Sequence, residues 1–362
     1  MTQAAAITIV IPSLARGGAE LVASRLANWL SRGGMAVRLV TFQRGDDEWP
    51  VNAEVQRSFI NDWKTPPRGD LELDPERTAV AALRSLLATQ TTHSIISFLT
   101  RMNLRVLQAA PAGVRVVVCE RSYPPARNFP PQLACQIADM YPAAHALVVQ
   151  TERCARNWAD TFMPFHRTHV LPNPFFPRDI PPDPIPVEGP YILAVGRFVP
   201  EKDISCLLHA FATVHPNLPD HSLVLVGDGP LRQALEDEAH DLGIAQAVHF
   251  NGFCANPAAL YRQADCFALP SRYEGFPNAL LEALWHGAPC VAADCTAGPA
   301  EMLGDGRRGL LFPPGDCYAL ARCLLHVCTN DGLRRTLAER GTAHAAAFTE
   351  DSVFSQWTRL LA

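Results

Sequence analysis

Short runs of apolar residues alternate with longer amphipathic stretches through the first half of the chain. The runs are apolar at nearly every position, which is typical of strands covered on both faces of a sheet, and the stretches have the three-to-four spacing of helices. The predicted strands lie at 7–11, 36–42, 94–98, 115–119 and 146–150, and the predicted helices at 18–31, 76–89 and 151–160. This alternation predicts an α/β domain with a doubly wound parallel sheet.

A proline-rich segment separates this domain from a second one of the same kind. Residues 175–190 contain six prolines, and neither a helix nor a central strand tolerates that density, because proline lacks the backbone N–H and fixes φ. A second alternation follows from Tyr191 to about Leu325, and the last stretch is again helical in pattern. We therefore predict a first domain at 1–175, a linker at 176–190, a second domain at 191–345 and a final helix at 346–362.

Three predicted strands of the second domain end in turns that carry glycine or charge. The strands at 191–195, 222–226 and 266–270 run into Gly-Arg, Gly-Asp-Gly and Ser-Arg-Tyr-Glu-Gly, and the first turn also holds Lys202. Parallel strands share their carboxyl edge, where ligands of open α/β sheets bind, and glycine allows close backbone approach there. Only Lys64 and Lys202 are lysines among 31 Lys+Arg. Keeping lysine in such a background indicates a need for a compact point charge, unless Lys202 is an ordinary surface residue.

Two carboxylates, Glu274 and Glu282, flank the start of a helix predicted at 279–287. The free N–H groups of a helix start suit a phosphate. Hydroxyls of a hexose and of a ribose are neutral donors that two carboxylates can hold at opposite ends of a pyrophosphate. The spacing therefore indicates a nucleotide sugar. The plainer alternative is that one glutamate is a turn residue and the other a solvated helix residue.

Several longer motifs make the pattern specific. GRFVPEKD (196–203), LVGDG (225–229), PSRYEGFPNALLEA (270–283) and HGAPCVAADCTAGPAEML (286–303) resemble the donor-binding half of retaining glycosyltransferases of family 4. ITIVIPSLARGGAE (7–20) is similar to that family's first strand and glycine loop, and LPNPF (171–175) to its interdomain segment. The resemblance implies the GT-B fold, in which two Rossmann-like domains face each other across a cleft and the final helix returns to the first domain. Within the family, DCTAGPAEML (294–303) looks most like bacterial enzymes that extend lipid-linked oligosaccharides in cell-surface polysaccharide synthesis, often with UDP-activated hexoses or N-acetylhexosamines.

The resemblance also implies roles for individual residues. Arg197 and Lys202 would stabilise the departing diphosphate, Glu274 would orient the donor hexose without forming a covalent bond, and Glu282 would hold the ribose. The other donor-binding candidates are Gly17, Gly18, Gly196, Gly227, Asp228, Gly229, Gly252, Ser271, Gly275, Phe276 and Asn278. No Asp-x-Asp stands at a strand end and two cations are present, so we expect no metal and no cofactor beyond the nucleotide sugar.

The acceptor side departs from the family pattern. Many relatives carry a histidine after the strand that corresponds to 114–120, where this chain has Glu-Arg-Ser. Candidate acceptor contacts are therefore Arg16, Arg101, Glu120 and Arg121.

Charge is divided unevenly between the two halves of the chain. Residues 1–180 hold 19 Lys+Arg against 15 Asp+Glu, and residues 181–362 hold 12 against 21. A positive first half favours an anionic partner, for which a polyprenyl diphosphate or an anionic membrane surface fits better than nucleic acid, since no dense basic run with interleaved aromatics is present. The aromatic and basic loop at 61–69 is a candidate contact with the inner membrane face, though an ordinary exposed loop is the plainer interpretation.

Cysteine use and hydropathy bear on the compartment. The eleven cysteines show no C-x-x-C and no Cys/His metal spacing, and most lie in apolar strands, which favours a reducing compartment. No signal peptide and no stretch of about 20 apolar residues is recognised. These features predict a cytoplasmic protein that associates peripherally with the membrane.

Two other functions compete with glycosyl transfer. A glycoside hydrolase would use the two glutamates as an acid/base pair, but it has no use for the glycine turns and the two cations. A non-catalytic nucleotide-sugar sensor would use the same pocket. A dehydrogenase is excluded because G-x-G-x-x-G is missing from the first turn of either domain.

Overall fold

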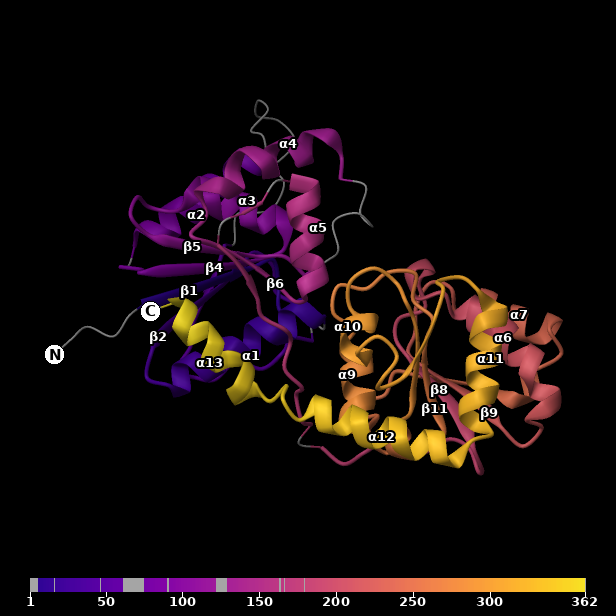
Figure 1. Ribbon diagram of the computed structural model, residues 1–362. Helices are drawn as coiled ribbons and strands as arrows, with labels where there is room; N and C mark the ends of the chain where they lie inside the picture. The colour runs from indigo at the N-terminus through magenta and orange to yellow at the C-terminus, as the bar shows by residue number, and fades with distance from the viewer. Residues whose placement is uncertain are drawn as a thin grey trace. The chain divides into compact units, whose positions relative to one another are not determined.

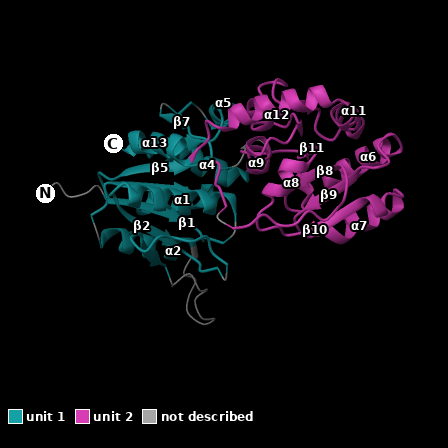
Figure 2. Cartoon of the chain, turned by 90° about the horizontal axis from the view of Figure 1, so that it is seen from below, with its two compact units in different colours: residues 1–174, 350–362 teal, residues 175–349 magenta. Residues whose placement is uncertain are grey.

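The chain forms two compact units. The computed structural model describes residues 6–15, 17–45, 47–60, 75–89, 91–121, 129–162, 164–165, 167–178 and 180–361. Unit 1 comprises residues 1–174 and 350–362, and unit 2 comprises residues 175–349 (Figure 2). The chain therefore passes from one unit to the other twice. The loop at 61–69 lies outside the described residues.

Unit 1 is built on a parallel seven-stranded sheet with the order β3-β2-β1-β4-β5-β6-β7. The order reverses between β1 and β4, which is the topological switch point of a doubly wound sheet. Its strands are β1 (Ala6–Ile11), β2 (Ala36–Thr41), β3 (Gln56–Phe59), β4 (Ser94–Phe98), β5 (Arg115–Cys119), β6 (Ala146–Val149) and β7 (Thr168–Val170). Its helices are α1 (Gly18–Arg32), α2 (Pro75–Ala88), α3 (Thr100–Ala109), α4 (Pro131–Met140) with the short η3 (Tyr141–Ala143), α5 (Glu152–Phe162) and α13 (Glu350–Leu361).

The final helix α13 packs on unit 1, although the chain reaches it only after unit 2 (Figure 1). Trp29 of α1 donates its indole N–H to the Asp351 carboxylate at 2.9 Å, and its ring lies 6.0 Å from that of Phe354. Near the end of α13, the ring of Trp357 stacks on that of Phe98 at 6.3 Å. An apolar face and two aromatic contacts therefore fix the helix to the sheet layer of unit 1.

Unit 2 holds a parallel six-stranded sheet with the order β10-β9-β8-β11-β12-β13 and a switch point between β8 and β11. Its strands are β8 (Tyr191–Val195), β9 (Ser222–Val226), β10 (Val248–Gly252), β11 (Cys266–Leu269), β12 (Cys290–Ala293) and β13 (Leu310–Phe312). Its helices are α6 (Ile204–Val214), α7 (Arg232–Asp241), α8 (Ala258–Gln263), α9 (Asn278–Trp285), α10 (Pro299–Leu303), α11 (Cys317–Cys328) and α12 (Asp331–Ala345), with 3-10 turns η4 (Pro200–Lys202), η5 (His215–Asn217) and η6 (Ala245–Ala247).

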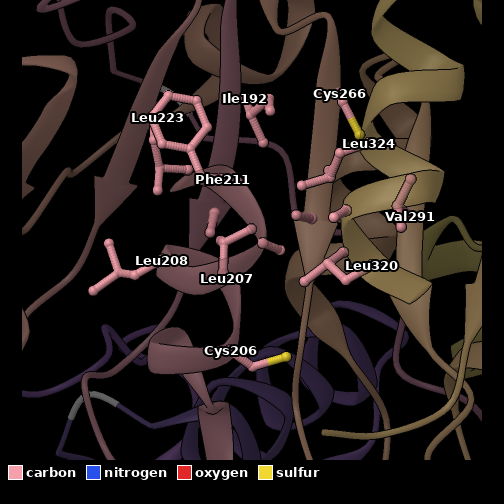
Figure 3. Close-up of a cluster of buried hydrophobic side chains, with 14 of the residues drawn as sticks. Ile192, Cys206, Leu207, Leu208, Phe211, Leu223, Cys266, Val291, Leu320 and Leu324 are labelled. Carbon is pink, nitrogen blue, oxygen red and sulfur yellow. The ribbon is translucent and has the colours of Figure 1, made fainter. Parts of the chain in front are cut away.

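The core of unit 2 explains why its strands are apolar throughout. Successive side chains of a strand point to opposite faces, so Ile192 packs with one buried cluster and Leu193 with the other. The first cluster brings Phe211 of α6 and Leu324 of α11 onto the sheet (Figure 3). Because helices cover both faces, neither side of a strand carries the polar alternation of a solvated sheet.

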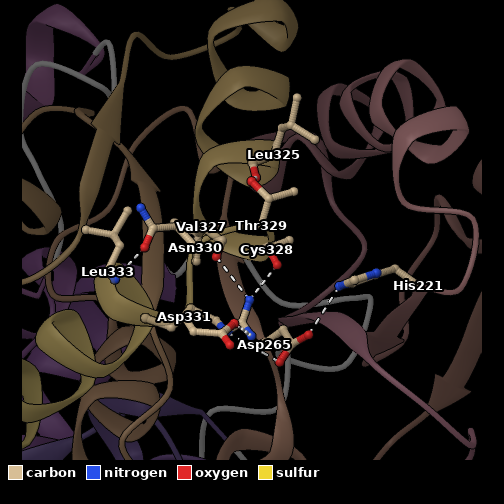
Figure 4. A network of polar contacts seen from close by, with 10 residues as sticks. His221, Asp265, Leu325, Val327, Cys328, Thr329, Asn330, Asp331 and Leu333 are labelled. Carbon is tan, nitrogen blue, oxygen red and sulfur yellow. Dashed lines mark hydrogen bonds and ion pairs between the residues drawn. The ribbon is translucent and has the colours of Figure 1, made fainter.

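A polar network ties α12 to the amino end of β11. The Asp265 carboxylate accepts a hydrogen bond from His221 Nε2 at 3.1 Å and lies 3.7 Å from Arg334 Nε (Figure 4). Arg334 also donates to the carbonyl of Cys328 at 2.5 Å. The arginine thereby satisfies carbonyl groups at the end of α11. This network stabilises the side of the sheet opposite the glycine turns.

None of the described helices combines the length and the apolar character needed to cross a lipid bilayer.

Candidate functional site

Backbone hydrogen bonds join the turns at the carboxyl ends of β8, β9 and β10. Gly196 N–H donates to the carbonyl of Val226 at 2.9 Å, and Phe198 N–H donates to that of Asp228 at 2.9 Å. Gly227 N–H donates to the carbonyl of Gly252 at 2.8 Å. Two of the three predicted turns, those after β8 and β9, therefore form one continuous rim with the end of β10.

Packing requires glycine at two positions of the second turn, which the sequence did not show. A β-carbon on Gly227 would lie 1.9 Å from the Gly196 carbonyl oxygen, and one on Gly229 would lie 2.5 Å from that of Phe198. Gly227 also has a φ of +137°, which other residues rarely adopt. Asp228 is exposed and accepts the Gly229 N–H at 2.8 Å. The structure thus gives these residues a role in holding the turns together, whether or not they also touch a ligand.

Lys202 and Glu274 meet across the switch point of unit 2. Lys202 Nζ lies 2.5 Å from Glu274 Oε1, and the hydroxyl of the buried Ser271 donates to the same oxygen at 2.7 Å. The side chains of Lys202 and Glu274 are 24% and 10% exposed. Both hydrogen bonds use Oε1, so Oε2 is left to accept from a ligand. The two residues that the sequence placed on separate turns form one charged pair.

A second ion pair, which the sequence analysis missed, fixes the position of this pair. Asp203 follows Lys202 in the left-handed region with φ +48°, and its carboxylate lies 3.0 Å from Arg272 Nε. Arg272 N–H also donates to the carbonyl of Glu201 at 2.9 Å. These contacts clamp the Lys202 turn to the Glu274 turn. The only sequence signal for this ion pair was that Asp203 and Arg272 carry opposite charges in two of the predicted turns.

The start of α9 follows the Glu274 turn directly. Its N-cap is Pro277, with no side-chain cap, and Asn278 is the first helical residue. Gly275 and Phe276 immediately precede it and are half-buried, while Arg197 on the first turn is exposed. The N-terminus of a helix favours an anion through the helix dipole and its first amides, which suits a phosphate group.

Glu282 lies on α9 within a cavity of about 250 Å³ that the linker helps to line. Arg178 Nη2 lies 3.4 Å from Glu282 Oε1, and Arg178 also donates to the carbonyl of Ala255 at 2.5 Å. Burial raises the pKa of Glu282, and the positive charge of Arg178 opposes that rise. Arg178 was not predicted, because it lies in the proline-rich segment, which the sequence presented only as a spacer.

In unit 1, the side chain of Glu20 partly occupies the space over the first glycine loop. Gly17 is the N-cap of α1 and Gly18 its first residue. A β-carbon on Gly17 would lie 2.2 Å from Glu20 Oε2, so this carboxylate lies over the loop. A phosphate would require Glu20 to move. Arg16, a predicted acceptor contact, lies outside the described residues.

Glu120 is corrected from an acceptor contact to a buried structural residue. It is 1% exposed, and its carboxylate accepts from Thr100 Oγ1 at 2.9 Å, from Asn103 Nδ2 at 3.0 Å and from the hydroxyl of Tyr141. Burial and the neighbouring carboxylate raise the pKa of Tyr141. These three partners enclose the Glu120 carboxylate, so it is not accessible to an acceptor. Its partners are distant in sequence, so the local motif could not reveal the network.

The two candidate acceptor arginines have different environments. Arg101 is exposed on the first turn of α3. Arg121 lies over the rings of Phe98 at 4.9 Å and Trp357 at 5.8 Å, and it donates from Nη1 to Asn173 Oδ1 at 2.9 Å. Its guanidinium is buried beside the Cys119 thiol, and burial lowers the pKa of the guanidinium.

Within the part of the chain that the structure describes, no three or more His, Cys, Asp or Glu side chains are grouped as a metal site. Metal independence stays a prediction.

Family models match both units. "Glycosyl transferase 4-like domain" matches residues 17–174, and "Glycosyl transferases group 1" matches residues 176–344. The chain is 27% identical, over 98% of both proteins, to a Campylobacter jejuni protein described as GalNAc-alpha-(1->4)-GalNAc-alpha-(1->3)-diNAcBac-PP-undecaprenol alpha-1,4-N-acetyl-D-galactosaminyltransferase. It is also 33% identical over 226 residues to the exopolysaccharide phosphotransferase SCO2592 of Streptomyces coelicolor, where the match covers 60% of this chain and only 23% of that protein.

Solved structures show the same fold. Anabaena HepE in complex with UDP superposes with a TM-score of 0.80 at 19% identity, covering 98% of this chain and 99% of the other. The doubly wound pair of units is therefore the GT-B fold, as the sequence predicted. Together the two family models cover the donor and acceptor halves that the motifs indicated, and the chain belongs to glycosyltransferase family 4.

Proposed function

We propose that the chain is a retaining, metal-independent glycosyltransferase that moves a hexose or N-acetylhexosamine from a nucleotide sugar, preferably a UDP-sugar, to a lipid-linked glycan. The observation that carries the proposal is the Lys202–Glu274 pair at 2.5 Å, at the switch point of unit 2. Ligands of open α/β sheets bind at this position. A cation, a carboxylate and a helix N-terminus together match a phosphorylated sugar.

Each of these groups has a distinct task in the proposed reaction. When the bond from the anomeric carbon to the phosphate oxygen breaks, the diphosphate gains negative charge. Lys202, Arg197 and the amides at the start of α9 stabilise that charge, and this electrostatic contribution is commonly the largest in catalysis. Oε2 of Glu274 accepts a hydrogen bond from a hydroxyl of the donor sugar and so orients that sugar. A diphosphate oxygen takes the proton of the acceptor hydroxyl, so no side chain forms a covalent intermediate.

Glu282 is proposed to hold the ribose diol. Arg178, 3.4 Å from its carboxylate, favours the charged form and opposes the rise in pKa that burial causes. The linker residues that line the same cavity would then contact the nucleoside.

The proposed acceptor is a glycan on a lipid diphosphate at the inner face of the membrane. Support comes from the positive balance of residues 1–180 and from the Campylobacter jejuni relative, whose name includes an undecaprenol-linked substrate. Arg101 and Arg121 remain the candidates for the acceptor diphosphate. The proposed setting is the cytoplasm, with peripheral attachment to the membrane.

A donor panel tests the proposal directly. UDP- and GDP-sugars are compared by thermal shift and by transfer to a synthetic lipid-diphosphate glycan, with and without EDTA, and product stereochemistry is read by NMR. We expect one UDP-sugar at 100 times its Kd to stabilise the protein by about 2.7 kcal/mol. Transfer should continue in EDTA with retention at the anomeric carbon. Activity that EDTA abolishes and Mg²⁺ restores would contradict metal independence. Cleavage of a simple glycoside without any nucleotide response would favour a hydrolase.

The two glutamates should separate kinetically. Glu274→Ala should mainly lower kcat, by about 10²-fold, because the donor sugar loses its orientation while nucleotide contacts persist. Glu282→Ala should mainly weaken nucleotide binding, measured by calorimetry with UDP. Glu236→Ala serves as the matched control, since it breaks a surface ion pair with Arg232 at 2.8 Å. Equal effects of both variants on UDP affinity would contradict the assigned roles.

A further inference from the structure

An apolar cavity of about 230 Å³ lies in unit 1, between α4, η3 and α5. Tyr141, Trp158, Phe162 and Phe165 supply aromatic surface, and Arg167 stands among the lining residues. A dry cavity of about 150 Å³ is enough to bind a benzene molecule. This cavity therefore has room for a ring or a short alkyl chain.

The cavity lies at the amino edge of the sheet, away from the predicted acceptor residues. Arg167 precedes β7 and Pro142 precedes β6, whereas Arg101 and Arg121 follow the carboxyl ends of β4 and β5. Parallel strands place these two sets on opposite edges. The cavity is thus separate from the proposed transfer site.

Basic side chains cluster beside the cavity. Arg167 Nη1 lies 3.1 Å from His145 Nδ1. Burial lowers the pKa of His145, and the positive charges of Arg167, Arg115 and His169 lower it further. Arg167, Arg115 and His169 thus place positive charge around His145.

The aromatic rings of the cavity wall pack on one another. Trp158 is 3% exposed. Its ring is held by stacking on Tyr141 at 5.8 Å and by Phe162 at 4.8 Å. These ring contacts hold a close-packed apolar wall against which a hydrocarbon chain can pack.

We propose that this cavity binds a single-chain amphipathic anion, with its apolar chain against Trp158 and Phe162 and its phosphate or carboxylate on Arg167. Apolar lining alone would suit any hydrocarbon. Arg167 in the lining and His145 beside it select a ligand that also carries negative charge. This inference does not depend on the transfer reaction.

Calorimetry with octyl phosphate as the probe tests the site. We expect one molecule to bind per chain, and inorganic phosphate and octanol each to bind more weakly by about tenfold or more, because each offers only half of the contacts. Arg167→Gln should weaken octyl phosphate binding by about tenfold or more. Arg156→Gln, an exposed arginine on α5, should leave it unchanged.

Variants that fill the cavity give an independent test of the proposal. Ala159→Phe should block binding. If that variant unfolds, Ala138→Phe replaces it, because Ala138 is exposed and also lines the cavity. Unchanged octyl phosphate binding in the folded blocking variant would overturn the proposal. So would equal affinity for inorganic phosphate, or binding to phosphatidylglycerol vesicles without any binding of free octyl phosphate.

Discussion

Replacing Lys202 by alanine should lower kcat by about 10²-fold or more while the fold persists, because in the proposed reaction the departing diphosphate loses one of its cations. The structure adds a second reason. Glu274, 10% exposed, would lose the ammonium 2.5 Å away and keep only the Ser271 hydroxyl, so its orientation would also be disturbed. Turnover is measured with the donor that the panel identifies.

Two further variants test whether the effect is specific to the lysine at this position. Lys202→Arg should restore only part of the turnover, since a planar guanidinium cannot occupy the position of a compact ammonium. Arg335→Ala removes an exposed cation from α12 and should leave turnover unchanged. Thermal unfolding checks that each variant is folded. Near-normal turnover of folded Lys202→Ala would remove the lysine from the proposed reaction.

Gly227→Ala should destabilise unit 2 by about 3–5 kcal/mol, combining steric overlap with backbone strain. The new β-carbon would lie 1.9 Å from the Gly196 carbonyl oxygen, and φ at this position is +137°. Relief requires separating the turns after β8 and β9, which also displaces Lys202. Denaturant unfolding measures the stability loss.

Gly243→Ala is the matched comparison. Its φ is +72°, yet nothing lies within 4 Å of an added β-carbon, so only backbone strain of about 1–2 kcal/mol is expected. Similar losses in the two variants would show that strain, and not contact between the turns, determines the requirement for glycine at 227.

The sequence predicted the buried strands well and the edge strands poorly. β1, β2, β4, β5 and β6 were found within one residue at either end, because helices cover both of their faces and leave continuous apolar runs. β3 and β7, with sequences QRSF and THV, lie at the sheet edges and carry too few apolar residues to be recognised. α3 was missed for a related reason, since it buries Asn103 and Arg105 against partners far along the chain.

The candidate site was predictable in its location but not in its pairings. Strand ends and helix starts placed Lys202 and Glu274 on one sheet edge, as the structure has them. Their ion pair, the Arg178–Glu282 contact and the enclosure of Glu120 each depend on residues from separate turns or on long-range packing. Periodicity and motif spacing carry no information about which side chains meet across such distances.

The placement of α13 has a consequence for the order in which the protein folds during synthesis. Unit 1 receives its last helix only after the ribosome has made all of unit 2, and until then the faces of α1 and β4 that Trp29 and Phe98 present to α13 are uncovered. Unit 2 is contiguous and can reach its native contacts first. Of the two units, the one that comes first along the chain is therefore completed last.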